Sequence, residues 1–101
     1  MYGTVARMQM KPGTEEQFMA MGSQMMARRI PGAVADYVYK MDNEPDVYYL
    51  AVVFESKEAY FANAESAEQA AEYEKLAAMF AAEPEWHDGE IVASWSETPE
   101  M

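Results

Sequence analysis

The stretch from Val47 to Phe54 is apolar at odd as well as even positions. Because side chains alternate across a β-strand, a strand here would present apolar side chains on both faces. Such a strand is typical of the centre of a sheet, with other elements packed above and below it. From Ser56 onward the apolar spacing changes to that of a helix, which predicts that a helix follows this strand directly.

Three further strands and three helices are predicted along the chain, and capping signals mark two of the helix starts. Thr14 with Gln17 and Ser66 with Gln69 have the spacing of a capping box. The turn residues Asp42–Asp46 predict an antiparallel hairpin between the second strand and the central one. The other predicted elements are a strand over Tyr2–Met10, a helix between Thr14 and Ile30, a strand over Ala33–Met41, a short helix over Lys57–Ala64, a helix from Ser66 to Ala82 and a strand over Glu90–Trp95.

This order of elements predicts the fold class. Strand, helix, strand, strand, helical region and strand is the ferredoxin-like α+β arrangement, a four-stranded antiparallel sheet with its helices on one face. The chain has 101 residues, which is the size of one domain. We expect a single domain over residues 1–96 and a polar tail over residues 97–101.

The sheet face without helices predicts a partner. We expect Val5, Val34, Val38 and one side of the central strand on that face. Leaving about five apolar side chains in water forgoes roughly 1.5–3 kcal/mol each, which rivals a whole domain stability of about 5–15 kcal/mol. A homodimer with two sheets packed face to face is therefore expected. Arg7 lies beside Val5 on this face, where its charge needs an ion-pair partner across the interface or a substrate.

The charge balance excludes several classes of partner. Lys and Arg number 7 against 18 Asp and Glu, a net charge of −11, so phosphate backbones and anionic lipid surfaces are poor partners. No apolar run is long enough to span a bilayer, and no secretory signal begins the chain, so a cytoplasmic protein is expected. Without cysteine and with one histidine, no metal site is predicted. No glycine-rich phosphate loop follows a strand, so no nucleotide cofactor is predicted either.

His87 and a set of aromatic residues are the candidates for chemistry. His87 is the only side chain whose ordinary pKa lies near neutrality, so it is a candidate general base, oriented by Asp88. The alternative is a solvated histidine in an acidic turn. Tyrosine hydroxyls could position an aromatic substrate, although tyrosines on strands also serve as cross-strand packing. The candidate substrate-binding residues are Tyr37, Tyr39, Tyr49, Phe54, Tyr60 and Tyr73.

Three segments resemble the antibiotic biosynthesis monooxygenase family: residues 6–13 (ARMQMKPG), 30–33 (IPGA) and 53–60 (VFESKEAY). The resemblance implies a dimeric α+β barrel and, as in several members, oxygenation of electron-rich aromatic substrates without metal or flavin. The family commonly has tryptophan where this chain has Phe54. Haem-degrading relatives use an asparagine, a tryptophan and a histidine at places that hold Ala6, Asn63 and Tyr73 here, so haem degradation is not expected.

The function predicted from the sequence is a cofactor-independent monooxygenase that oxidises a quinol or a polycyclic phenol. One alternative is a non-catalytic small-molecule binding or stress-related dimeric module of the same fold. Another is an isomerase or other acid–base enzyme. A monooxygenase consumes oxygen in step with its substrate, a binding module only shifts the melting temperature, and an isomerase works without oxygen.

Overall fold

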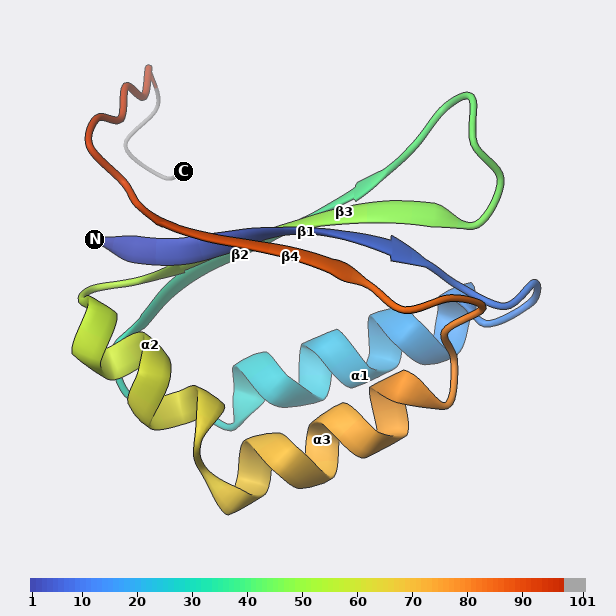
Figure 1. Cartoon of the computed structure of the whole chain (residues 1–101), viewed down its shortest axis with the longest axis horizontal. Coiled ribbons are helices and arrows are strands. Elements are labelled where there is room, and N and C mark those ends of the chain that lie inside the picture. The colour runs from blue at the N-terminus through green and yellow to red at the C-terminus, as the bar shows by residue number, and fades with distance from the viewer. Residues whose placement is uncertain (98–101) are drawn as a thin grey trace.

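A computed structural model describes residues 1–97 of the chain, so residues 98–101 of the predicted tail lie outside the described part. The elements are β1 (Tyr2–Gln9), α1 (Glu15–Ala27), β2 (Ala33–Lys40), β3 (Val47–Phe54), α2 (Lys57–Ala64), α3 (Ala67–Ala77) and β4 (Glu85–Glu90). The strands form one antiparallel sheet in the order β2-β3-β1-β4 (Figure 1). This confirms the predicted ferredoxin-like fold, with β3 and β1 at its centre. Within residues 1–97, no helix combines the length and hydropathy that crossing a bilayer requires.

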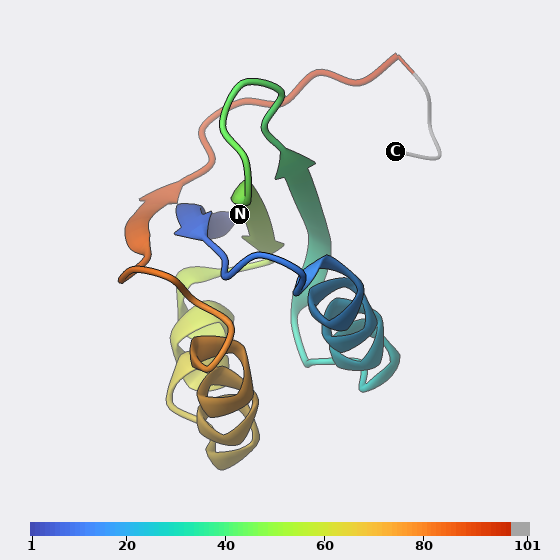
Figure 2. The same cartoon turned by 90° about the vertical axis from the view of Figure 1, so that its right-hand side faces the viewer.

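The three helices cover one face of the sheet, with α1 below the β2 side and α2 and α3 below the β4 side (Figure 2). Alternate side chains of β1 and β3 point toward the helices and form the core with Phe18 of α1 and Met79. Ala6 and Met8 of β1 are fully buried there. Ser66 accepts a hydrogen bond from the backbone N–H of Gln69, as the capping signal predicted.

The last strand is the main correction to the predicted elements. We expected it over Glu90–Trp95, whereas β4 runs over Glu85–Glu90. Helix α3 ends at Ala77, and the chain after it is held against the end of β1 by hydrogen bonds from Lys11 N–H to the Met79 carbonyl and from Ala81 N–H to the Gln9 carbonyl. The pairing of β4 with β1 therefore begins at Glu85, ahead of the apolar segment over which we expected the strand. An edge strand tolerates the charged residues and the glycine that this places in β4.

The sheet face turned away from the helices, here called the open face, also differs in part from the prediction. Val38 pairs with the helix-facing Leu50, so it belongs to the covered face and not to the open one. Val34 lies at an irregularity in the β2–β3 pairing between Ala33 and Ala35. The residues that the register places on the open face include Val5, Arg7, Tyr37, Tyr39, Tyr49, Ala51, Val53 and His87.

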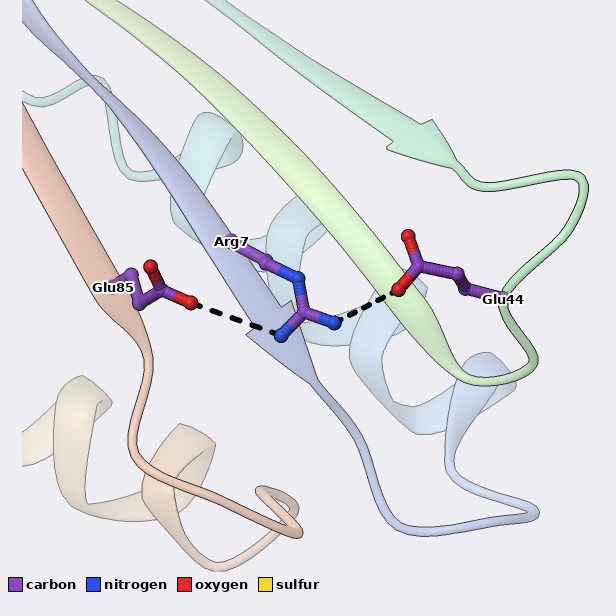
Figure 3. A network of polar contacts seen from close by, with 3 residues as sticks. All are labelled: Arg7, Glu44 and Glu85. Atoms are coloured by element: carbon purple, nitrogen blue, oxygen red, sulfur yellow. Dashed lines mark hydrogen bonds and ion pairs between the residues drawn. The ribbon is translucent and has the colours of Figure 1, made fainter.

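Arg7 is paired on the open face within its own chain (Figure 3). Its Nη2 lies 3.0 Å from Glu44 Oε2, on the β2–β3 loop, and its Nη1 lies 3.9 Å from Glu85 Oε2 on β4. The hydrogen bond to Glu44 is the main cause of the raised pKa of Arg7. The positive charge of Arg7, which was expected to need a partner across the interface or a substrate, therefore has two partners in its own chain. Together, Arg7, Glu44 and Glu85 carry one net negative charge on this face.

Candidate active site

A cavity of about 590 Å³ lies between the sheet and the helices. All seven elements contribute side chains to its wall, and most of these are apolar or aromatic. Phe54 of β3, Tyr73 of α3 and Trp86 of β4 are among the aromatic residues that line it. A volume of this size suits a small aromatic molecule, and apolar walls with a few polar groups are typical of ligand sites.

Two carboxylates and a hydroxyl on the helix-facing side of the sheet lie in one row across the strands, and the hydroxyl and one of the carboxylates line the cavity. Asp36 pairs with Val52, Val52 pairs with Thr4, and Thr4 pairs with Asp88. Register partners point to the same side of a sheet, so all four side chains face the helices. Because neighbouring strands are about 4.8 Å apart, the backbones of Asp36 and Asp88 are separated by roughly 14 Å. The row therefore has a carboxylate at each edge of the sheet and a hydroxyl between them.

Tyr60 of α2 lies over one end of this row. Ser56 fixes the start of α2 by accepting a hydrogen bond from the Ala59 N–H, and the Tyr60 ring packs 5.6 Å from Phe54 and 5.3 Å from Tyr2 between ring centres. Its hydroxyl donates a hydrogen bond of 2.8 Å to Asp88 Oδ1. Burial, followed by this bond to Asp88, raises the pKa of Tyr60 to about 12. The phenol therefore remains protonated at neutral pH.

Thr4 supplies the hydroxyl in the middle of the row. The residue is 6% exposed, and its Oγ1 makes no hydrogen bond of acceptable geometry with any residue of the described chain. It lies close enough to Tyr60 to oppose, in part, the rise of that tyrosine's pKa. A buried hydroxyl without a partner costs free energy, and this one lines the cavity, where a ligand atom can satisfy it.

Asp36 lines the cavity from β2, on the other side of Val52. The residue is exposed to solvent on this edge strand of the sheet. Surrounding side chains nevertheless displace much of its hydration shell, and this desolvation raises the pKa of its carboxyl.

The structure separates the residues predicted from the sequence into two groups. Phe54, Tyr60 and Tyr73 line the cavity. Tyr37, Tyr39, Tyr49 and His87 project from the open face, on the other side of the sheet. His87 pairs with Val5, whereas its neighbour Trp86 pairs with the buried Ala6 and faces the cavity. A catalytic role for His87 therefore stays a prediction, and within one chain its side chain does not line this cavity.

The sequence reasoning passed over three residues of the site, namely Thr4, Asp36 and Trp86. Alternation along Tyr2–Met10 placed Thr4 on one face with Met8, and the buried methionines would have marked that face as the inner one. Asp36 alternates in phase with Val38, which we expected on the open face, whereas the pairing of Asp36 with Val52 turns it toward the helices. Trp86 lies before the segment over which the last strand was expected. Among residues 1–97, no three His, Asp or Glu side chains converge as metal ligands.

Comparison with protein families gives a match over residues 1–76 to the antibiotic biosynthesis monooxygenases. The chain belongs to this family. The matched residues contain Thr4, Asp36 and Tyr60, while Asp88 of β4 lies beyond them. No curated protein matches the chain.

Solved structures of members and relatives share the fold. SnoaB from Streptomyces nogalater, a cofactor-independent oxygenase solved as a mutant, has a TM-score of 0.80 at 16% identity, covering 95% of this chain and 97% of its own. A candidate antibiotic biosynthesis monooxygenase from Chloroflexus aurantiacus has a TM-score of 0.77 at 22% identity, with 94% and 96% covered. A conserved protein from Methanosarcina mazei has a TM-score of 0.76 at 17% identity, with 87% and 89% covered.

Proposed function

We propose that this member of the antibiotic biosynthesis monooxygenase family is a cofactor-independent monooxygenase that oxidises a quinol or a polycyclic phenol in the cavity. The observation that carries the proposal is the Tyr60–Asp88 hydrogen bond at the cavity wall, beside the unpartnered hydroxyl of Thr4. Membership of the family and the shared fold of SnoaB, a cofactor-independent oxygenase, support the same reaction class.

The first step of the reaction is removal of a proton from the substrate. As the substrate phenol gives its proton to Tyr60 Oη, Tyr60 passes its own proton to Asp88, which lies on the exposed edge strand and exchanges protons with water. Tyr60 thus remains neutral throughout, as its raised pKa requires. Thr4 Oγ1 donates a hydrogen bond to the substrate oxygen as negative charge develops there.

The second step uses molecular oxygen as the only co-reactant. The deprotonated substrate places electron density on a ring carbon, which forms a C–O bond with O₂ and, after protonation, a hydroperoxide. Loss of the remaining proton from that carbon breaks the O–O bond and releases water, so that a carbonyl remains. One ring C–H group, one phenol C–OH group and one O₂ thus become two C=O groups and one H₂O. The apolar walls of the cavity exclude bulk water from the reactive anion.

Oxygen uptake by the purified, metal-free protein tests the proposal. With a panel of quinols and anthrone-like phenols, we expect uptake above autoxidation, in equal amounts with the substrate consumed. The His87→Ala variant should retain this activity within about twofold, because His87 projects from the open face. Loss of activity in the variant would instead support the base that the sequence predicted. Uptake equal to that of buffer across the panel, with a ligand-induced rise in melting temperature, would favour a binding module.

We also propose that the protein is a homodimer joined through the open face. Val5, Tyr37 and Tyr39 are 50%, 40% and 57% exposed on this face of the single chain. Contiguous exposed apolar and aromatic side chains on a sheet are typical of an interface. Arg7 also lies on this face, and its ion pairs with Glu44 and Glu85 mean that its charge needs no partner from a second chain. The cavity lies on the opposite side of the sheet, so the two sites of such a dimer would be separate.

Light scattering coupled to size-exclusion chromatography tests the dimer. We expect the mass of two chains for the wild type and a shift toward one chain for Tyr39→Asp, which puts a carboxylate into the proposed interface. Ala20→Asp adds the same charge at an exposed position of α1 and should leave the dimer intact. A single-chain mass for the wild type at micromolar concentration would contradict the dimer.

A further inference from the structure

Among the described residues, the formal charge on the wall of the cavity is negative only. Asp36 is the one Asp or Glu among its lining residues, and no lysine, arginine or histidine of the described chain lines it. Tyr60 and Tyr73 are the other titratable residues of the wall. An anionic ligand would therefore meet a carboxylate with no cation to offset it, inside a chain whose net charge is already −11.

Asp36 has no partner of its own in the described chain. No hydrogen bond or ion pair within residues 1–97 reaches its carboxylate. The nearby strand cation, Lys40, is engaged by Glu15 at 2.8 Å. Arg7 is bound to Glu44 on the other face of the sheet. Desolvation raises the pKa of this carboxyl and so disfavours its ionised form, whereas a ligand cation beside it would favour the ionised form.

We infer that Asp36 makes the cavity selective for aromatic substrates that carry a protonated amine. This inference rests on the proposed function and names its substrate class. Asp36 and Thr4 lie in the same row, two strand spacings apart, which is roughly 10 Å between backbones. An aromatic molecule of two or three fused rings fits this span, with its ammonium at Asp36 and its reactive oxygen at Thr4 and Tyr60. Asp36 is thus a binding residue that sets specificity and orientation.

Calorimetric titration under argon tests the inference without turnover. Three probes share one ring system and differ in charge: 2-naphthylmethylamine, 2-naphthylmethanol and 2-naphthoate. For the wild-type protein at neutral pH, we expect the amine to bind about tenfold more tightly than the alcohol, and the carboxylate at least about tenfold more weakly. Equal affinities for the amine and the alcohol would overturn the inference.

The Asp36→Asn variant identifies the residue responsible. It keeps the shape of the side chain and removes the charge, so the preference for the amine should disappear while the affinity for the alcohol stays the same. Asp42→Asn, in the exposed β2–β3 turn, removes one charge far from the cavity wall and should preserve the preference. If Asp36→Asn weakened both ligands equally, or if Asp42→Asn abolished the preference, the inference would be wrong.

These results remain separable from the oxygenase proposal. Binding is measured without oxygen, so a preference for the amine that depends on Asp36 would stand even if no substrate were oxidised. Conversely, oxygen uptake with neutral phenols but no preference for the amine would overturn this inference alone. Thermal melting of both asparagine variants without ligand verifies that they are folded.

Discussion

Replacing Gly3 with alanine is expected to lower the free energy of unfolding by about 3 kcal/mol or more. Gly3 lies in β1 and pairs with Val53 of β3 at the centre of the sheet. A Cβ atom there would overlap the Val52 carbonyl oxygen and lie 2.9 Å from the Val52 carbonyl carbon. Both are backbone atoms, so the two central strands would have to separate locally. Urea unfolding followed by circular dichroism measures the effect.

Gly89 provides a matched control for this prediction. It is the register partner of Gly3 on β4, in the same sheet and with the same substitution, yet a Cβ atom there would have no neighbour within 4 Å. Gly89→Ala should therefore change the free energy of unfolding by no more than about 0.5 kcal/mol. Equal losses of stability in the two variants would show that the close approach of β1 and β3 at Gly3 is not the cause.

The fold was predictable because its local signals agree with one another. The apolar faces of Val47–Phe54 marked the centre of the sheet, and the capping residue Ser66 began a helix where it was expected. Which side chains of β2 face the helices was not predictable. Val38 on one face and Tyr39 on the other are both apolar or aromatic, so alternation alone does not say which of them meets the helices. Only the pairing with β3 decides it.

The candidate site was predictable only in part. Phe54 and Tyr60 were expected to bind the substrate and line the cavity, but Tyr49, expected in the same role on the same strand as Phe54, lies on the open face, because a strand that is apolar on both faces does not show which face is the inner one. Trp86 comes from β4, whose strand character arises from pairing with β1 and not from its own residues. A single aspartate such as Asp36 looks the same in sequence whether it faces solvent or a cavity. Its direction became known only from the register.

The register also places His87 and Trp86 on opposite faces of the sheet. His87 and Trp86 are neighbours in the chain, but alternate side chains of a strand point to opposite faces. Trp86 therefore belongs to the cavity and His87 to the open face, where we propose that a second chain packs. Substitutions at His87 should act on association, whereas substitutions at Thr4, Tyr60 and Asp88 should act on chemistry.

Replacing Tyr60 with phenylalanine is expected to reduce kcat by about 100-fold, the size of a typical contribution from positioned proton transfer. The ring and its packing against Tyr2 and Phe54 remain, so the cavity keeps its shape and KM should change little. Only the hydroxyl that bridges the substrate and Asp88 is lost. Tyr49→Phe is the matched control, because it removes the same group on the open face and should leave kcat unchanged.

Asp88→Asn tests the same relay from its other end. An asparagine can accept the hydrogen bond of Tyr60 but is a far weaker base, so kcat should again fall by about 100-fold while the Tyr60 ring stays in place. Because both side chains act on one proton, the double variant Tyr60→Phe with Asp88→Asn should be little slower than either single variant. Multiplied losses in the double variant would mean that the two residues act independently and that no relay connects them. Oxygen uptake under saturating substrate, recorded for all four proteins of the cycle, distinguishes these outcomes.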